Sequence, residues 1–223
     1  MTLSTETNAP GSAGSGTAED VQPIAQLVLW ERQARVRRLG GELASCFWPD
    51  ATVTTSWMSG SVQDYLHAGD ARARRAEAGT DELITNRSSA PNIHVRGERA
   101  YAELPVETNH WIRVHGEEAV WTSLMRLVYR CEKRGGIWKI SDMTSLFEAD
   151  KLAPAVPGTD LRVNPADVRG FRRSYRWLAY VRLQAGGTVS QDLPGTDRET
   201  DVERVYGAAR AWLDGARTES AEG

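Results

Sequence analysis

The chain has 223 residues, 26% of them charged, and a formal net charge of −3. This length allows one domain with a sizeable core, plus an extension. Acidic and basic residues are interspersed and no apolar run reaches membrane-spanning length, so we expect neither a nucleic-acid partner nor a membrane span.

The cysteines and the N-terminus both indicate a cytoplasmic location. Cys46 and Cys131 lie far apart with no paired spacing, which argues against a disulfide framework or a zinc site and suits a reducing compartment. The N-terminus carries Glu6 and no apolar run, so it does not resemble a signal peptide.

The first predicted elements are a tail and a long helix. Residues 1–19 are rich in Ser, Thr, Gly and Ala without periodicity, which predicts disorder. A helix from Asp20 to about Arg38 follows, with Ile24 and Val28 on its apolar face. Glu31 and Arg35 fall on or beside this face. They form either a solvated pair four residues apart or an inward-facing polar group.

Short elements come next. Gly40-Gly41 ends the first helix, and we expect a second helix over Glu42–Phe47 and a strand over Ala51–Trp57. Ser61 is the expected N-cap of a third helix, whose basic end is Arg72-Ala73-Arg74-Arg75.

Three long strands are the clearest feature of the sequence: Tyr101–His115, Ala119–Cys131 and Ile137–Leu146. The breaks between them are short, which predicts antiparallel hairpins, because a parallel crossover needs a dozen or more residues. The even positions of the first strand are mostly apolar and include His110. The imidazole is therefore expected on the covered face of the sheet.

The C-terminal part predicts two amphipathic helices after a linker over Lys151–Val163. The first begins at Asn164-Pro165 and continues to Gly186-Gly187. The second follows a capping box formed by Thr196 and Glu199. Their apolar stripes have three possible partners: the outer sheet face, each other or a second subunit.

Order and spacing resemble a known family. The relevant segments are Leu43–Ala51, Asn92–Ala102 and Gly136–Ile140, and they resemble the SnoaL-like branch of the nuclear-transport-factor-two-like superfamily. The resemblance implies an α+β fold, a cone in which a strongly curved, mostly antiparallel sheet wraps around N-terminal helices and leaves an apolar pocket. It divides the chain into a tail at 1–19, the cone domain at 20–150, and a linker with a helical extension at 151–223.

Members of this family include polyketide cyclases, dehydratases, epoxide hydrolases, a ketosteroid isomerase and proteins without chemistry, so the fold alone does not select a reaction. In scytalone dehydratase, one pocket histidine falls by position at His110, whereas its other histidine falls at Arg87. Its tyrosine–aspartate pair falls near Arg35-Val36 and its strand tyrosine near Thr55. This chain keeps one of these elements and is not expected to be that dehydratase.

Three residues are candidates for catalysis. His110 is a candidate acid or base, with a hydrogen-bonded core histidine as the alternative. Arg87, if it faces inward, would bind a carboxylate or stabilise an enolate; otherwise it forms a salt bridge at the rim. Asp142 shares the strand parity of Trp138 and Ile140, so it would orient His110 or act as a base, or else be an exposed strand-end acid.

The candidate substrate-binding residues are aromatic, thioether or acidic side chains, with core packing as the alternative: Trp57, Tyr65, Met125, Tyr129 and Glu31. No phosphate-binding glycine loop is present, and the four histidines are scattered. We expect no metal and no cofactor.

These features predict a cofactor-independent enzyme that performs cyclisation, dehydration or isomerisation by proton transfer. Its substrate would be an apolar oxygenated small molecule, such as a polyketide or terpenoid intermediate of secondary metabolism. Two alternatives remain: a non-catalytic binding or dimeric assembly module, and an accessory subunit of an oxygenase. A homodimer is the expected assembly.

Overall fold

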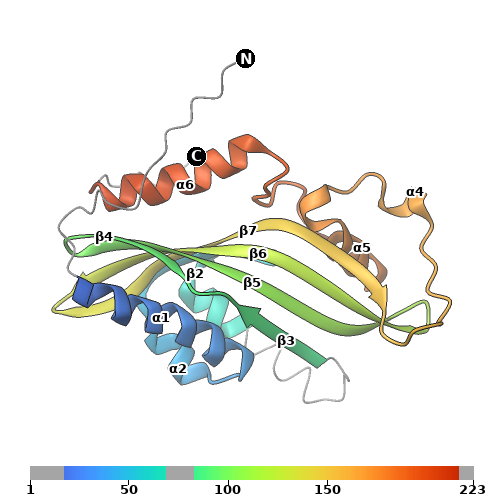
Figure 1. Cartoon of the computed structure of the whole chain (residues 1–223), viewed down its shortest axis with the longest axis horizontal. Helices are drawn as coiled ribbons and strands as arrows, with labels where there is room; N and C mark the ends of the chain where they lie inside the picture. The colour runs from blue at the N-terminus through green and yellow to red at the C-terminus, as the bar shows by residue number, and fades with distance from the viewer. Residues whose placement is uncertain (1–17, 69–82, 216–223) are drawn as a thin grey trace.

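The computed structural model describes residues 18–68 and 83–215, and it has an α+β architecture (Figure 1). Of the tail expected over residues 1–19, residues 1–17 lie outside the described residues, as does the basic segment Arg72–Arg75, whereas Ala18 and Glu19 already belong to the first helix. Helix α1 spans Ala18–Val36 and α2 spans Gly40–Ser45. Residues 62–68 form a helical segment whose N-cap is Ser61, which accepts a hydrogen bond from the Asp64 backbone N–H at 3.2 Å, as predicted.

One seven-stranded sheet organises the fold, in the order β2-β1-β7-β6-β5-β3, with β4 also paired to β5. The strands are β1 Phe47–Thr54, β2 Ser59–Ser61, β3 Leu83–Ser88, β4 Asn92–Arg96, β5 Arg99–Val114, β6 Glu117–Arg134 and β7 Ile137–Pro154. The hairpins β5–β6 and β6–β7 are antiparallel, as predicted, whereas β1 runs parallel to β7.

Several predicted boundaries were wrong. The strand expected over Ala51–Trp57 runs from Phe47 to Thr54. The second helix ends at Ser45 rather than Phe47, because Phe47 already pairs with Ile140 of β7. The expected linker over Lys151–Val163 begins four residues too early, because Lys151–Pro154 continue β7 opposite Ala119–Thr122. At Phe47 and at Lys151–Pro154, pairing with a neighbouring strand decides the local structure, against what the nearby proline and charged residues favour.

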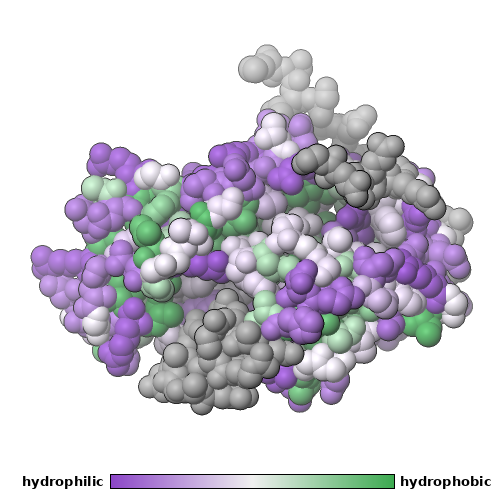
Figure 2. Space-filling view, turned by 180° about the vertical axis from the view of Figure 1, so that it is seen from behind, coloured by the Kyte–Doolittle hydropathy of each residue, from purple (hydrophilic) through white to green (hydrophobic). Residues whose placement is uncertain are grey.

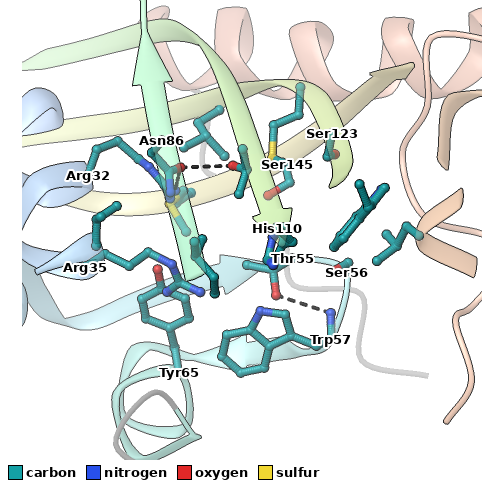
Figure 3. Close-up of a pocket in the computed structure, with 18 of the residues that line it drawn as sticks. Arg32, Arg35, Thr55, Ser56, Trp57, Tyr65, Asn86, His110, Ser123 and Ser145 are labelled. Carbon is teal, nitrogen blue, oxygen red and sulfur yellow. Dashed lines mark hydrogen bonds between the residues drawn. The ribbon is translucent and has the colours of Figure 1, made fainter. Parts of the chain in front are cut away.

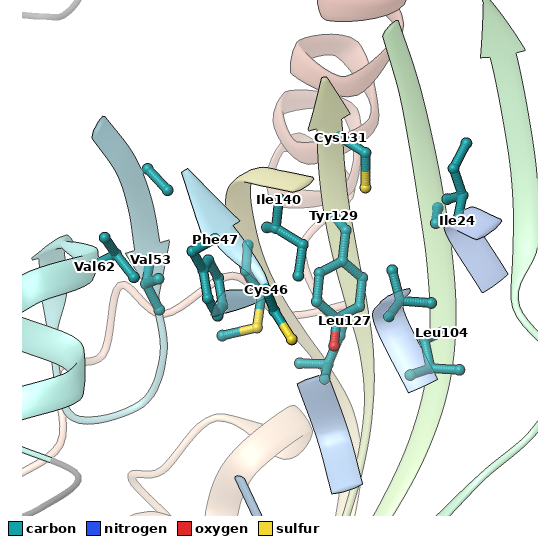
Figure 4. Close-up of a cluster of buried hydrophobic side chains, with 14 of the residues drawn as sticks. Ile24, Cys46, Phe47, Val53, Val62, Leu104, Leu127, Tyr129, Cys131 and Ile140 are labelled. Carbon is teal, nitrogen blue, oxygen red and sulfur yellow. The ribbon is translucent and has the colours of Figure 1, made fainter. Parts of the chain in front are cut away.

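The main core fills the concave side of the sheet, between the sheet and α1 (Figure 4). On β5 the even positions from Ala100 to His110 are all buried, which confirms the predicted alternation. Ile24 and Val28 of α1 are fully buried against this face. Each such side chain contributes about 1.5–3 kcal/mol through the removal of apolar surface from water.

Two β-bulges change which residues of β7 face inward. Opposite β6, Cys131 pairs with Ile140 but Arg130 pairs with Asp142, so Ser141 is an extra residue. A second shift lies between Leu124 and Met125, where Glu148 is the extra residue. Each extra residue reverses the in–out alternation of the strand. Parity counted from Ile140 therefore fails beyond the first bulge.

The expected long helix after Asn164 is broken into three short pieces. Asn164 caps α4 (Pro165–Val168) by accepting from the Ala166 backbone N–H at 3.0 Å, as predicted. A 3-10 turn, η1 (Arg173–Tyr175), and α5 (Arg176–Gln184) follow. The break occurs at Arg172, whose backbone is extended.

The last helix, α6 (Glu199–Leu213), forms without the predicted capping box. Thr196 does not cap it, because the Thr196 backbone N–H donates to the Phe147 carbonyl at 2.8 Å and its hydroxyl donates to the Glu148 carbonyl at 3.3 Å. Gly215 ends the helix with a φ of +89°, a value that glycine adopts without strain.

The two C-terminal helices cover different parts of the same sheet. Helix α6 lies along the convex face, opposite α1 (Figure 1), where Val205 and Ala209 pack on Val128 and Leu146. Helix α5 lies at the end of β5, β6 and β7, where Leu178 packs with the neighbouring aromatic side chains. Of the three partners that the sequence left open, the outer sheet face is correct for α6. Helix α5 instead packs beside Trp121 and Phe147 in the wall of the cavity, which the sequence did not predict.

Arg172 fastens the C-terminal segment to the domain. Its guanidinium donates to the Leu193 carbonyl at 2.8 Å and pairs with the carboxylates of Asp197 and Asp201, while its side chain is only 9% exposed. Burial acts to raise the pKa of both carboxyl groups. At Asp197 the hydrogen bonds from Arg172 and Ser174 and the charge of Arg172 together outweigh burial. At Asp201 the bonds from Arg204, the Gly195 N–H and Arg172 do so, and each pKa therefore ends below its ordinary value.

This ion-pair cluster predicts a pH-dependent contribution to stability. Because both folded-state pKa values are lowered, the stabilisation is complete above the unfolded carboxyl pKa and is lost as the pH falls below about 4. Replacing Arg172 by Met should destabilise the fold by about 1.5–3 kcal/mol at pH 7, since it removes the cation from Asp197 and leaves the buried Asp201 with Arg204 as its remaining ion-pair partner. Urea unfolding of both proteins should show that this difference shrinks at pH 3. A difference that is unchanged or larger at pH 3 contradicts the assignment.

Gly195 occupies a position where no larger residue fits. A Cβ atom there would lie 2.7 Å from Asp197 Oδ1 and 2.9 Å from both Arg172 and Ser174. Gly195→Ala should therefore destabilise the fold by about 1–3 kcal/mol. The matched control is Gly207→Ala in α6, where a Cβ meets nothing within 4 Å. That change should stabilise by about 0.5–1 kcal/mol. Thermal unfolding of both variants tests the pair, and equal shifts would refute the argument.

On the face shown in Figure 2, hydrophilic residues predominate and hydrophobic ones form small groups between them. The large hydrophobic side chains that are exposed belong to separate elements, such as Trp30 on α1, Leu124 on β6 and Leu183 on α5. No helix within residues 18–68 and 83–215 is long and apolar enough to cross a membrane.

Candidate functional site

A cavity of about 860 Å³ lies between α1, the concave face of the sheet and α5. Its size falls in the range of pockets that hold small organic molecules. The wall combines apolar residues from β5, β6 and β7 with polar residues from α1 and β3 (Figure 3). The cavity thus occupies the place where the family resemblance predicted a pocket.

His110 lies in the wall of this cavity, as predicted. It is 9% exposed and stacks on Trp121, its cross-strand neighbour on β6, with the ring centroids 4.4 Å apart and the planes at 25°. Ile84 of β3 is its neighbour on the other side. The stacking on Trp121 fixes the plane of the imidazole in the cavity wall.

A polar group from three elements lies on the α1 side of the cavity. Asn86 Oδ1 accepts from Arg32 at 2.6 Å and from the Thr108 hydroxyl at 2.9 Å (Figure 3). Arg32 is 8% exposed, and its Nε has no hydrogen-bond partner among the described residues. These bonds hold the guanidinium in one orientation and leave a buried N–H donor for a ligand.

Hydroxyl groups supply further donors along β6 and β7. Ser123 and Ser145 both line the cavity and are almost fully buried. The Ser123 hydroxyl has no hydrogen-bond partner among the described residues. Because a buried hydroxyl without a partner is costly, a ligand oxygen at this position would be stabilised.

Three of the predicted substrate-binding residues do line the cavity: Trp57, Tyr65 and Met125. Trp57 and Tyr65 stack with centroids 5.6 Å apart and an interplanar angle of 12°. The Arg35 guanidinium lies 4.5 Å from the Tyr65 centroid and 5.6 Å from the Trp57 centroid. The inward-facing alternative for Arg35 is therefore correct.

The other two predicted substrate-binding residues lie behind the wall rather than in it. Glu31 and Tyr129 are fully buried, and the Tyr129 hydroxyl donates to Glu31 Oε2 at 2.8 Å. Tyr65 donates to Glu31 Oε1 at 3.3 Å. Burial and then the Glu31 charge raise the pKa of Tyr129 well above its ordinary value. Tyr129 belongs to the core in Figure 4, and the expectation that its side chain lines the pocket was wrong.

The two other catalytic candidates lie away from the cavity. Arg87 follows Asn86 on β3, so its side chain points to the opposite face of the strand and is exposed. Its guanidinium donates to the Asn86 carbonyl at 2.9 Å. Asp142 is buried outside the cavity wall and pairs with Arg130 at 2.8 Å. The bulge at Ser141 turns Asp142 outward and places Met143 in the wall instead. Neither residue is brought near His110.

Helix α5 closes the cavity at the open end of the cone. Leu178 and Val181 contribute apolar surface, and Arg182 donates to the Ser56 carbonyl and hydroxyl, both at 3.1 Å. Asp150 accepts from the Leu178 backbone N–H at 2.7 Å at the start of this helix. Burial raises the pKa of Asp150 despite these bonds. The C-terminal extension therefore supplies one wall of the site.

Neither cysteine is placed for chemistry. Cys46 and Cys131 are both buried and are not disulfide-bonded. Burial raises the pKa of Cys46 to about 11 and that of Cys131 to about 12, so both remain protonated thiols at neutral pH. Within residues 18–68 and 83–215, no group of three or more His, Cys, Asp or Glu side chains is arranged to hold a metal ion.

Several wall residues were missed by sequence reasoning, namely Arg32, Asn86, Thr108, Ser123 and Ser145. Two signals could have identified part of this set. Thr108 and Ser123 share the strand parity of His110 and Met125. Arg32 follows Ile24 and Val28 at intervals of four along α1, which places it on the buried stripe.

Comparison with known proteins agrees with this architecture. The SnoaL-like domain matches residues 17–144. Pea pathogenicity protein 2 of Fusarium vanettenii is 30% identical over 188 residues, which are 78% of this chain and 77% of that protein.

Two solved structures are more distant. The hexachlorocyclohexane dehydrochlorinase LinA Type2 is 15% identical with a TM-score of 0.49, covering 66% of this chain and 95% of that one. The β subunit of benzoate 1,2-dioxygenase from Burkholderia mallei is 12% identical with a TM-score of 0.46, and the match covers 58% of this chain and 89% of that one. Family membership rests on the domain match and on the fungal relative: the chain belongs to the SnoaL-like domain family.

Proposed function

We propose that this protein is an enzyme that performs proton-transfer chemistry, without a cofactor, on an apolar oxygenated small molecule in the cavity. The observation that carries the proposal is the placement of His110. Its imidazole, a side chain that can accept and donate a proton, is held in a fixed plane by stacking on Trp121 in the wall of a cavity of about 860 Å³. Dehydration and isomerisation are the reactions that suit the site best.

The chemistry needs only groups that line the cavity. His110 takes a proton from a carbon beside a substrate carbonyl, and the electron pair of that C–H bond moves to the carbonyl oxygen. The Nε–H of Arg32 and the Ser123 hydroxyl, both without a partner among the described residues, stabilise the resulting enolate. The imidazolium then gives the proton to a leaving hydroxyl, which departs as water, or to a different carbon.

A non-catalytic binding module is the second candidate, and the observation that supports it is that three predicted partners of His110 do not line the cavity. Arg87 and Asp142 do not reach the cavity, and Tyr129 is committed to Glu31. The polar groups that do converge with His110 come from other positions: Arg32, Asn86, Thr108 and Ser123. Their convergence favours the enzyme.

Native mass spectrometry of protein purified from its own host would separate these candidates. We expect a retained polyketide- or terpenoid-like compound, which can be released and identified. Incubation with fresh protein should convert this compound if the protein is an enzyme, whereas a binding module should return it unchanged. Protein that is always empty and always bound to a second protein would contradict both and favour an assembly role.

A further inference from the structure

The charged residues of the cavity wall are unbalanced. Among the described residues that line it, Arg32, Arg35, Arg38 and Arg182 carry positive charge, and none is Asp or Glu. Arg38 is exposed, and the Arg182 guanidinium donates a hydrogen bond to the Ser56 carbonyl. The two arginines of α1 that remain, Arg32 and Arg35, lie three residues apart and reach into the same side of the cavity (Figure 3).

Neither of these two guanidinium groups is neutralised by a carboxylate within residues 18–68 and 83–215. Arg32 donates to an uncharged amide, that of Asn86. In the part of the chain that the structure describes, the Arg35 guanidinium contacts the ring faces of Tyr65 and Trp57 and has no other side-chain partner. The nearest acid on the helix, Glu31, accepts from Tyr65 and Tyr129 and forms no salt bridge among the described residues.

Cations that are partly removed from water require an anion or strong acceptors nearby. An arginine fork matches the two oxygens of a carboxylate and binds them bidentately. The rest of the wall offers apolar surface for the body of such a ligand, from Ile112, Trp121, Phe147 and Leu178. His110 and Trp121 stack at the border between the polar and the apolar parts.

We propose that the ligand of this cavity is an apolar carboxylic acid whose carboxylate binds at Arg35. This inference names the substrate class for the proposed function and rests on the same cavity. Arg35 would anchor the acid group beside Tyr65 and Trp57, so that the carbons next to the apolar body lie against His110. Arg32 would remain free to stabilise charge that develops during the reaction.

The test compares two ligands that differ in charge but hardly in shape, 1-naphthaleneacetate and 1-naphthaleneacetamide, by titration calorimetry at pH 7. We expect the acid to bind at least about tenfold more tightly than the amide, the usual scale of a hydrogen bond to a charged group. Arg35→Gln should abolish this preference. The matched control is Arg37→Gln. Arg37 is an exposed arginine directly after the end of α1, and it stacks on Trp30 outside the cavity, so this variant should retain the preference.

An acid that binds no more tightly than its amide, or that does not bind at all, overturns the assignment. So does a preference that survives Arg35→Gln. The experiment measures equilibrium binding and needs no turnover, so it is independent of whether His110 is catalytic. Charge selectivity without conversion of the natural compound would support the carboxylate site and contradict the proposed enzymatic function. Conversion without charge selectivity would support the enzymatic function and contradict the carboxylate site.

Discussion

His110→Gln is expected to lower turnover of the natural compound by roughly 10²–10⁴-fold, the usual contribution of a general acid or base. Glutamine keeps a polar side chain of similar length but cannot exchange a proton near neutral pH. The fold should survive, because the change removes one ring-stacking contact worth about 0.5–1.5 kcal/mol. Initial rates and thermal unfolding, measured on the same preparation, separate loss of chemistry from loss of structure.

The matched control for this variant is His94→Gln. His94 also stacks on a cross-strand aromatic residue, Tyr101, with centroids 4.5 Å apart, but it does not line the cavity. It therefore reproduces the loss of stacking without the loss of a proton carrier at the site. Equal rates for wild type and His110→Gln would remove His110 from the mechanism, and equal losses in both variants would point to a structural effect.

Replacing Glu31 by Leu should destabilise the fold by about 2–5 kcal/mol, because it leaves two buried tyrosine hydroxyls without their acceptor. The carboxylate is fully buried and receives both hydroxyl bonds, at 2.8 Å from Tyr129 and 3.3 Å from Tyr65. Tyr129→Phe alone should cost about 1.5–3 kcal/mol, the scale of a hydrogen bond to a charged group. Urea unfolding gives both values.

The double variant tests whether these residues act as one network. Once Glu31 is replaced, removal of the Tyr129 hydroxyl takes away an unsatisfied group. The destabilisation of the double variant should therefore be smaller than the sum of the destabilisations of the two single variants. Tyr101→Phe is the control, since no hydrogen bond to the Tyr101 hydroxyl occurs among the described residues; its effect should stay within about 0.5 kcal/mol. A Glu31→Leu protein as stable as wild type would contradict the network.

Strand alternation was the strongest signal in the sequence, and it located the centre of the site. The parity of β5 placed His110 on the inner face, and the structure agrees because β5 pairs with β6 in one register along its full length. The same rule failed for Asp142, because the extra residue Ser141 reverses the alternation of β7. No local feature of the sequence marks that bulge.

The helices were harder to place, because their partners depend on tertiary packing. The stripe from Ile24 and Val28 could have identified Arg32 as inward-facing, yet an arginine on an amphipathic helix is ordinarily assigned to solvent. The position of α5 at the cavity mouth depends on Arg172, whose contacts with Leu193, Asp197 and Asp201 are more than 15 residues away in the chain. Such contacts leave no periodicity to read.

The most direct test of the account follows proton transfer itself. The compound released from the cavity is incubated in D₂O with wild type and with His110→Gln, and NMR follows conversion and deuterium at each carbon. The account predicts conversion by wild type, with deuterium entering at a carbon beside the carbonyl, and neither event on the same timescale with His110→Gln. A compound that wild type leaves unchanged and free of deuterium, or that both proteins convert at equal rates, would contradict it.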